Sequence, residues 1–277
     1  MHCLGLAFIF KIKKILQLIL ETYIEKTFGL KNKIACVTGC NKGIGLALAE
    51  GLALAGADII AITRSIQKED SPLAEKIKSA GKKLYSYQCD FSDRESIYTC
   101  VKELNSHHPN IDILVNNAGM IKRNPIIEHS DAYWDEVISV NLTSQFIFTR
   151  EIGTGMLKQG SGKIIFIASL LSFQGGILVP GYAASKGGIN SLIKSFSNEW
   201  ANKGININGI APGYISTENT AALRSDTERS TSILSRIPAS RWGDPEDLVG
   251  STIFLASKAS DYMNGTIITV DGGWMGR

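Results

Sequence analysis

The sequence has few of the residue patterns that hold metals and disulfides. Its 277 residues include five cysteines, an odd number without a Cys-x-x-Cys pair, and four histidines without a His-Glu-x-x-His pattern. Disulfide frameworks and zinc sites depend on paired ligands at regular spacing. We therefore expect neither a disulfide framework nor a bound metal. Cys36 and Cys89 lie in apolar runs and are expected to be buried free thiols.

An excess of charge of one sign is also missing. Lys and Arg number 29 against 26 Asp and Glu, so the formal net charge is only +3, and the basic residues are scattered among the acidic ones. A protein that binds nucleic acid needs a basic patch or stripe. We therefore expect no nucleic acid among its partners.

Long hydrophobic runs are missing too, including at the N-terminus. The apolar stretch LGLAFIF is too short to span a bilayer, and Lys11, Lys13 and Lys14 interrupt the apolar residues after it. A secretory signal would carry its charges before the apolar stretch and end in a small-residue cleavage site, and neither is clear. We expect residues 1–27 to be a poorly ordered extension, with an amphipathic helix on a membrane surface as the alternative. We expect no membrane span, and we expect the protein to lie in the cytoplasm.

What the sequence does contain, from Leu30 onward, is a regular alternation of strand-like and helix-like segments. The predicted strands are Ile34–Thr38, Asp58–Thr63, Lys83–Cys89, Ile111–Asn116, Lys163–Ala168, Ile205–Ile210 and Thr266–Val270. The predicted helices are Gly45–Ala55, Ser92–Asn105, Ala132–Met156, Ala183–Lys203 and Pro245–Ser257. Most strands are nearly continuous apolar runs, which is typical of parallel strands covered on both faces. The alternation predicts an α/β fold, a doubly wound parallel sheet of about seven strands with helices on both faces, within one domain over residues 28–277.

The stretch VTGCNKGIG, residues 37–45, comes after the first predicted strand and opens the first predicted helix. In a doubly wound sheet the pyrophosphate of a dinucleotide binds at this turn, because free backbone N–H groups and the helix dipole favour anions there. Gly39 permits the tight turn, and Gly43 and Gly45 permit close approach and packing. The loop therefore predicts both a tight turn and a phosphate cradle.

The spacing Thr-Gly-x-x-x-Gly-x-Gly resembles the glycine signature of the short-chain dehydrogenase/reductase family. The stretches NNAG at 116–119, YAASK at 182–186 and Pro-Gly at 212–213 resemble further motifs of that family in the same order. The resemblance covers nearly all of the chain after the extension. It implies a Rossmann-type fold and an NAD(P)-dependent oxidoreductase that acts on CH–OH groups. The cofactor-binding residues that it implies are Gly39, Asn41, Lys42, Gly43, Ile44, Gly45, Arg64, Asp90, Phe91, Asn117, Ala118, Gly119, Tyr182, Lys186, Pro212, Gly213, Ile215 and Thr217.

Four residues are candidates for catalysis. Tyr182 and Lys186 stand four residues apart, on one face of a predicted helix. An ordinary tyrosine has a pKa of about 10, and a nearby ammonium lowers that pKa, so Tyr182 can exchange a proton with an alcohol oxygen near neutrality. Ser169 ends a predicted strand, where its hydroxyl can hold the substrate oxygen. The resemblance further implies that Lys186 binds the nicotinamide ribose and that Asn141 holds a water linking Lys186 to solvent.

The end of the second predicted strand bears on the choice between NAD and NADP. An acidic residue there would bind the ribose 2′-hydroxyl of NAD, but this chain reads Ile62-Thr63-Arg64-Ser65. Arg64 can pair with the 2′-phosphate of NADP, and Lys42 in the glycine loop can assist. We therefore favour NADP, while NAD stays open because related enzymes that use it also lack the acid.

Longer stretches narrow the resemblance to the branch of the family that acts on sugar acids. They include SLLSFQGGILVPGYAASK and RIPASRWGDPEDLVG, and the substrates implied are of the 2-deoxy-D-gluconate and 2-dehydro-3-deoxy-D-gluconate type. A carboxylate needs a cation in its pocket. The candidate substrate contacts are Arg123, Ser169, Gln174 and Arg224. Arg123 can instead be a solvated loop charge, and Thr217–Arg236 is expected to be a mobile lid.

One departure and two alternatives remain. Relatives in this branch usually have Arg where this chain has Leu178, which leaves the identity of the sugar acid open. A 3-oxoacyl-carrier-protein reductase shares the whole catalytic set, and a non-catalytic nucleotide-binding regulatory protein would share the fold. By resemblance alone we also expect a homotetramer, formed partly through the helix after Tyr182 and the C-terminal strand.

Overall fold

The computed structural model describes residues 22–277 and contains one seven-stranded parallel sheet. The strand order is β3-β2-β1-β4-β5-β6-β7, and every neighbouring pair is parallel. The strands are β1 (Ile34–Thr38), β2 (Asp58–Thr63), β3 (Leu84–Gln88), β4 (Ile113–Asn116), β5 (Gly162–Ile167), β6 (Ile205–Pro212) and β7 (Ile267–Val270). The doubly wound sheet predicted from the sequence is therefore confirmed.

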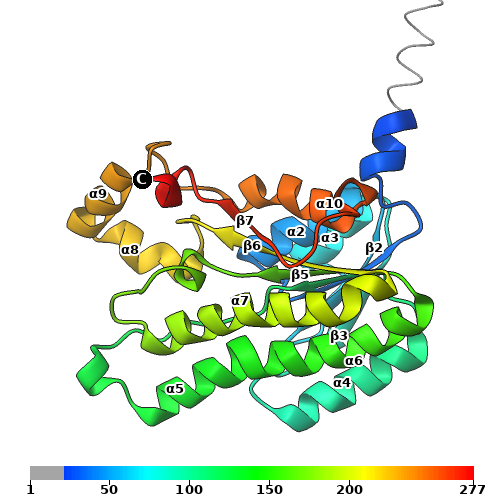
Figure 1. Cartoon of the computed structure of the whole chain (residues 1–277), viewed down its shortest axis with the longest axis horizontal. Helices are drawn as coiled ribbons and strands as arrows, with labels where there is room; N and C mark the ends of the chain where they lie inside the picture. Colours follow the sequence, from blue (N-terminus) through cyan, green and yellow to red (C-terminus); the bar gives the residue numbers. More distant parts are fainter. Residues whose placement is uncertain (1–21) are drawn as a thin grey trace, which may run out of the picture.

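Helices cover both faces of the sheet (Figure 1). One layer contains α2 (Gly43–Leu54), α3 (Pro72–Ser79) and α10 (Val249–Ala256). The other contains α4 (Arg94–His107), α5 (Asp131–Ile138), α6 (Ser144–Gln159) and α7 (Pro180–Trp200). Two further helices, α8 (Ala221–Ser225) and α9 (Thr227–Arg236), lie in the predicted lid at one end of the molecule.

The strands read as continuous apolar runs because each contributes to two cores. In β1, Cys36 packs with α4, α6 and α7, whereas Ala35 and Val37 pack with α2 and α10 on the other face. All three side chains are fully buried. Burial on both faces removes the hydrophobic-polar alternation of a half-exposed strand, and this is why the strands could be predicted so closely.

Two helix predictions need correction. Helix α3 was not predicted, although Ser71 accepts a hydrogen bond from the Ala74 N–H and Pro72 opens the helix. The helix predicted over Ala132–Met156 is not continuous: α5 and α6 are joined by a π-helical turn, Ser139–Thr143. Such turns carry one extra residue and often occur at functional sites.

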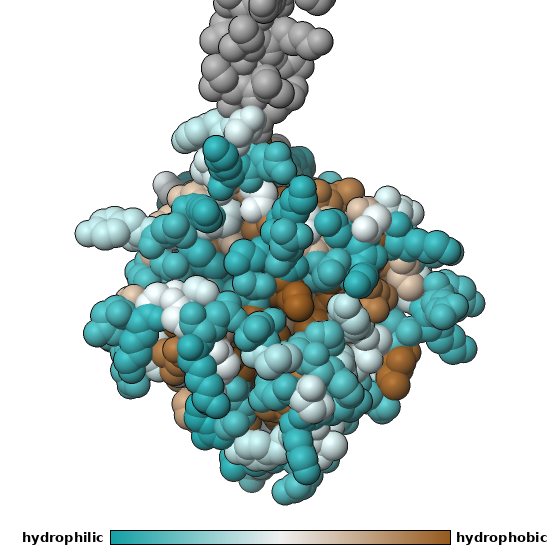
Figure 2. Space-filling model, turned by 90° about the vertical axis from the view of Figure 1, so that its right-hand side faces the viewer, coloured by the Kyte–Doolittle hydropathy of each residue, from teal (hydrophilic) through white to brown (hydrophobic). Residues whose placement is uncertain are grey.

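The N-terminal extension was predicted over residues 1–27, of which residues 1–21 lie outside the described part of the chain. Residues 22–28 are helical and mostly exposed. In residues 22–277, no helix combines the length and the apolar character needed to cross a bilayer. Figure 2 looks at the end of the molecule opposite the lid, and its surface is mainly hydrophilic with a few hydrophobic side chains between the polar ones.

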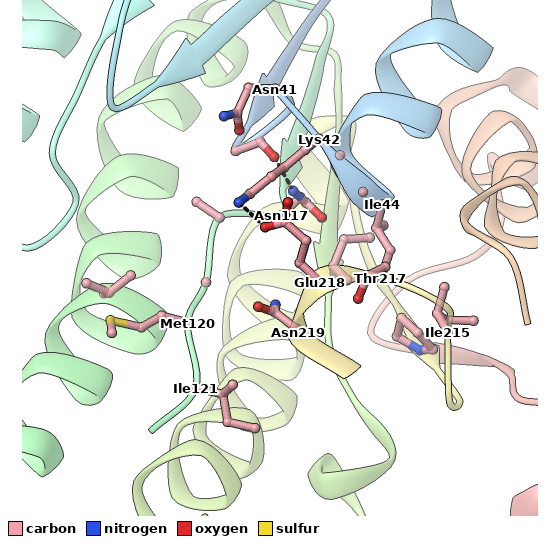
Figure 3. A pocket seen from close by; sticks show the side chains of 18 of the residues that line it. Asn41, Lys42, Ile44, Asn117, Met120, Ile121, Ile215, Thr217, Glu218 and Asn219 are labelled. Carbon is pink, nitrogen blue, oxygen red and sulfur yellow. Dashed lines mark hydrogen bonds and ion pairs between the residues drawn. The ribbon is translucent and has the colours of Figure 1, made fainter. Parts of the chain in front are cut away.

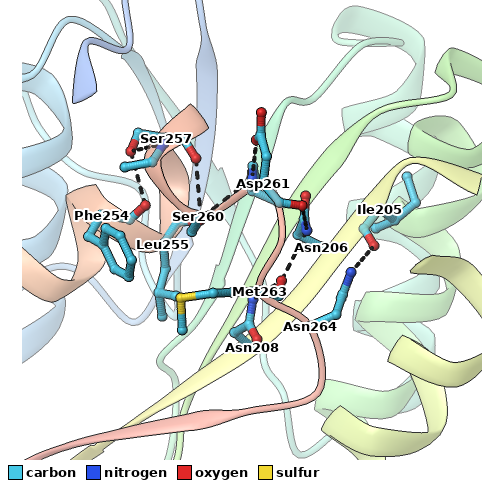
Figure 4. Close-up of polar contacts among 12 residues, drawn as sticks. Ile205, Asn206, Asn208, Phe254, Leu255, Ser257, Ser260, Asp261, Met263 and Asn264 are labelled. Atoms are coloured by element: carbon cyan, nitrogen blue, oxygen red, sulfur yellow. Dashed lines mark hydrogen bonds and ion pairs between the residues drawn. The ribbon is translucent and has the colours of Figure 1, made fainter. Parts of the chain in front are cut away.

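Asparagine side chains fix the segment that leads into β7 (Figure 4). Asn206 and Asn208 on β6 donate to the carbonyl oxygen of Met263 at 3.0 and 2.9 Å. The Asn264 side chain accepts from the Ile207 N–H at 2.7 Å. These bonds satisfy backbone groups outside the strand ladder, and they set where the C-terminal strand begins.

Candidate active site

A cavity of about 970 Å³ opens at the carboxyl ends of the strands, where doubly wound sheets bind ligands. All eighteen residues predicted to bind the cofactor line it. Several lining residues were not predicted, among them Met120, Ile121, Val140, Glu218, Asn219 and Thr220. The structure therefore brings the sequence motifs together in one place, while their individual roles stay predictions.

The glycine loop forms the floor of the cavity. Gly39 and Gly43 have φ values of 65° and 55°, which L side chains rarely adopt. A Cβ on Gly45 would lie 2.3 Å from the Gly39 carbonyl oxygen and 2.5 Å from Asn117 Nδ2. Helix α2 begins at Gly43, so its first N–H groups and the positive end of its dipole face the cavity. These features fit the pyrophosphate of a dinucleotide.

Asn117 holds this loop in place. Its side-chain amide donates to the carbonyl oxygens of Thr38 and Gly39 at 2.9 and 3.0 Å. The Thr38 hydroxyl accepts from the backbone N–H groups of Asn117 and Ala118, both at 2.9 Å. The predicted NNAG stretch thus joins the ends of β1 and β4 beside the cavity.

The end of β2 carries a cation at the cavity wall. Arg64 is exposed there, and no salt bridge is found for it within residues 22–277. The neighbouring Asp90 has a lowered pKa because it accepts hydrogen bonds from Ser92, and the charge of Arg64 adds to this effect. Arg64 can therefore bind a phosphate at this end of the cavity.

Tyr182 and Ser169 meet at the opposite end. The Ser169 hydroxyl is oriented by accepting the Leu171 N–H at 3.1 Å, and it lies close enough to Tyr182 to influence the pKa of that residue. Burial raises the pKa of Tyr182, whereas the neighbouring Ser169 hydroxyl and the charge of Arg123 oppose that rise. The expectation that the Lys186 ammonium lowers the pKa of Tyr182 therefore needs correction: the pKa is raised in the structure, and the charge that opposes the rise is that of Arg123.

Lys186 lies beneath the tyrosine. Its ammonium is 5.6 Å from the centre of the Tyr182 ring and donates to the Ile167 carbonyl oxygen at 2.6 Å. The residue is only 3% exposed, and burial lowers its pKa to about 8. The ammonium is therefore mostly charged at neutral pH and can still release a proton slightly above it.

Asn141 does not line the cavity but stands directly behind it. It lies in the π-helical turn and is fully buried. Its amide donates to the Met120 carbonyl oxygen at 2.8 Å and accepts the Met120 N–H at 2.8 Å. A further bond to Ser185 Oγ at 3.2 Å connects it to α7. The turn therefore fixes the wall next to Tyr182.

The lid reaches over the cavity from the end of β6. Lys42 in the glycine loop forms an ion pair with Glu218 of the lid (Figure 3). Arg123 Nη2 donates to the Asn219 carbonyl oxygen at 3.0 Å, and Arg224 Nη2 donates to the Thr217 carbonyl oxygen at 3.1 Å. Arg123 thus ties the start of the lid to the segment after β4, Arg224 braces the lid internally, and Lys42 adds an exposed ion pair.

The predicted substrate contacts are only partly assembled. Ser169 and Arg224 line the cavity, whereas Gln174 and Arg123 do not, although Arg123 contacts the lining residue Asn219. Leu178 is 43% exposed, and its carbonyl oxygen accepts the Asn124 N–H at 2.9 Å.

Among residues 22–277, no group of three or more potential metal ligands is found.

Comparison with known proteins gives the family. The sequence model of the short chain dehydrogenases matches residues 33–228. A 2-dehydro-3-deoxy-D-gluconate 5-dehydrogenase of Pseudoalteromonas atlantica (strain T6c) is 59% identical over 254 residues, which are 92% of this chain and 100% of the relative. The enzyme of the same name from Bacillus subtilis (strain 168) is 50% identical over 255 residues, 92% of this chain and 99% of its own.

A solved structure supports the same assignment. It is a gluconate 5-dehydrogenase from Burkholderia cenocepacia J2315 in complex with NADP and tartrate, with a TM-score of 0.86 at 38% identity. The match covers 91% of this chain and 98% of that one. Since the family model spans most of the chain and the glycine, NNAG and YAASK motifs surround one cavity, the chain belongs to the short-chain dehydrogenase family.

Proposed function

We propose that this protein is an NADP-dependent oxidoreductase that interconverts a secondary alcohol and a ketone on a sugar acid of the 2-deoxy-D-gluconate or 2-dehydro-3-deoxy-D-gluconate type. The observation that carries the proposal is that Tyr182, Ser169 and Lys186 face the same cavity as the glycine loop. A proton-transfer group and a dinucleotide cradle in one cavity are what alcohol oxidation needs. The names of the most similar relatives support the substrate class.

In the proposed mechanism, the bound nicotinamide accepts or supplies the hydride. Tyr182 takes the alcohol proton in oxidation and returns it to the ketone oxygen in reduction. Ser169, which lines the cavity beside Tyr182, donates its hydroxyl hydrogen to the same oxygen. The positive charge of Arg123 favours the phenolate and opposes part of the cost of burying it, and the Lys186 ammonium stands 5.6 Å from the centre of the Tyr182 ring.

NADP is favoured over NAD because two cations of the cavity would be available to bind a 2′-phosphate. Arg64 and Lys42 both line the cavity at the end of β2 and in the glycine loop. A carboxylate that would repel the phosphate is absent from the stretch Ile62–Ser65. The NADP in the Burkholderia cenocepacia structure supports this choice.

The substrate carboxylate is proposed to bind near Arg123. Its guanidinium is close enough to Tyr182 to influence the pKa of that residue, and it contacts the lid. A second arginine, Arg224, enters the cavity from the lid itself. Arginine pairs strongly with carboxylates. Leu178 supplies no such charge, so the carboxylate would depend on these two arginines.

We further propose that the enzyme is a cytoplasmic homotetramer. The edge strand β7 is partly exposed along its length, and Phe146 on α6 is 39% exposed. Both are surfaces on which a second copy could pack. Light scattering should give a mass of about 120 kDa, four times the 30.0 kDa chain, and a stable monomer would contradict the tetramer.

The function is tested by following the NAD(P)H absorbance with purified protein, both cofactors, and a panel of sugar acids and acyl-thioesters. We expect the highest kcat/KM with NADP and 2-deoxy-D-gluconate or 2-dehydro-3-deoxy-D-gluconate. A preference for a 3-oxoacyl-thioester would replace the proposed substrate class with that of a 3-oxoacyl-carrier-protein reductase. Equal or better use of NAD would overturn the cofactor preference alone.

A further inference from the structure

We infer that Glu218 of the lid is a determinant of cofactor selectivity, because its carboxylate competes with the 2′-phosphate of NADP for the ammonium of Lys42. The inference rests on the proposed function, since it assumes that the cavity binds NADP. It assigns Glu218 a role that no family motif of the sequence analysis gave it.

The contact is an ion pair between segments 176 residues apart in the chain. Lys42 is the N-cap residue of α2, and its ammonium, which can only donate, cannot cap the first N–H groups of the helix. It therefore pairs with an anion instead. Glu218 is the partner found for it among residues 22–277. Figure 3 shows the two side chains meeting in the pocket that both of them line.

The Lys42 ammonium therefore has two possible anionic partners, the Glu218 carboxylate and the 2′-phosphate of NADP. Lys42 and Arg64 are the cations proposed for the 2′-phosphate, and an ammonium held by Glu218 must be shared with the phosphate or released to it. NAD has no 2′-phosphate, so its binding does not compete for Lys42 in this way. Glu218 thereby weakens NADP binding more than NAD binding.

The size of the effect depends on the exposure of the pair. The Lys42 and Glu218 side chains are 63% and 75% exposed, so water and salt screen their attraction. Exposed ion pairs of this kind shift an equilibrium by at most about fivefold. Glu218 thus adjusts the preference between the two cofactors and does not decide it.

The lid does not depend on Glu218 for its position. Arg123 holds the Asn219 carbonyl oxygen, and the Thr220 hydroxyl donates to the Ile215 carbonyl oxygen at 2.6 Å. Neutralising Glu218 should therefore leave the start of the lid folded. This makes the inference testable with a single isosteric substitution.

The test measures the Kd of NADP and of NAD directly, by isothermal titration, for the wild type and Glu218→Gln. We expect the NADP Kd to fall about three- to fivefold in the variant while the NAD Kd changes less than about twofold. Glu228→Gln is the matched control, because Glu228 is an exposed lid carboxylate outside the cavity lining. It should leave both Kd values within about twofold.

Repeating the measurement in a Lys42 variant tests whether Glu218 acts through Lys42. In Lys42→Met protein, adding Glu218→Gln should no longer change the ratio of the two Kd values, because the contested ammonium is gone. An equal change for NADP and NAD, or an unchanged selectivity gain without Lys42, would overturn the inference while leaving the proposed function intact. Wild-type protein that binds neither nucleotide would overturn both.

Discussion

Tyr182 is the residue whose chemistry the structure constrains most directly. Its hydroxyl lies near that of Ser169, and burial raises its pKa against the opposing charge of Arg123. Tyr182→Phe keeps the ring and removes the group that exchanges the proton. We expect kcat to fall by about 10²- to 10⁴-fold while the Kd of NADP(H), measured by titration, changes little.

Tyr262→Phe is the matched control for this substitution. Tyr262 is fully exposed, and no hydrogen bond of its hydroxyl is found within residues 22–277. The control should keep wild-type kcat and Kd. Substantial turnover in Tyr182→Phe would mean that another group carries the proton, and the catalytic assignment would have to be abandoned.

Lys186 links the site to the stability of the protein. Burial lowers its pKa to about 8 in the folded state, against about 10.4 when unfolded. Between these values the unfolded chain binds more protons, so the free energy of unfolding rises with pH. Lys186→Met lacks this titration, and the wild type should gain about 3 kcal/mol relative to it between pH 8 and pH 10.5.

The measurement is urea unfolding of both proteins at several pH values, without added nucleotide. Subtracting the two curves cancels the other groups that titrate in this range, provided that the substitution leaves their surroundings unchanged. A difference that stays flat from pH 8 to pH 10.5 would show that the lysine has an ordinary pKa despite its burial.

Among single residues, those that belong to a sequence motif could be predicted from the sequence. Residues that come into contact only because the chain folds could not. Tyr182, Lys186 and the glycines stand at fixed spacings, and the cavity brings them together. Glu218 is an ordinary lid residue until folding places it against Lys42. Nothing in local sequence spacing indicates a contact of that kind.

At the scale of structural elements, the glycine loop between β1 and α2 is expected to tolerate no side chain at Gly45. A Cβ on Gly45 would lie 2.3 Å from a backbone oxygen, so Gly45→Ala forces the turn between β1 and α2 to shift. We expect the NADP Kd to rise at least about tenfold and the protein to lose about 1–3 kcal/mol of stability. Calorimetric titration and urea unfolding measure the two effects.

Gly250→Ala is the comparison for the same chemical change. Gly250 is exposed in α10, and a Cβ there meets no atom within 4 Å. This variant should gain up to about 1 kcal/mol, because alanine favours a helix interior over glycine. If Gly45→Ala behaved like Gly250→Ala, the close packing at the glycine loop would not matter for binding.

Elements differed in how well the sequence predicted them, for a physical reason. The strands are buried on both faces, so their apolar runs are unambiguous. Helix α3 has only two buried residues, Leu73 and Ile77, so its hydrophobic signal is short. The π-helical turn at Ser139–Thr143 continues the helical pattern on both sides, and only its hydrogen bonds distinguish it from one long helix.

At the scale of the whole molecule, the lid rests on residues from distant parts of the chain. A small core joins Leu170, next to Ser169, with Ile233 and Ile237 at the end of α9 and with Trp274 near the C-terminus. The Trp274 ring lies 4.7 Å from the ring of Tyr214. The C-terminal residues thus support the lid from below, beside the catalytic serine.

Trp274→Ala should therefore loosen the lid more than the sheet. The ring is 5% exposed and also stacks with the Arg236 guanidinium at 4.0 Å, so its loss leaves a cavity beneath α9. We expect faster amide hydrogen exchange in Ala221–Ser225 and Thr227–Arg236 and a kcat/KM about tenfold lower, with the exchange of β1 and β4 unchanged.

Met275→Ala is the control, because Met275 is a 37% exposed neighbour outside this core. It should leave the exchange of the lid, the exchange of the sheet and kcat/KM unchanged. Faster exchange throughout the sheet would instead make Trp274 part of the global core, and the lid would then have no separate support.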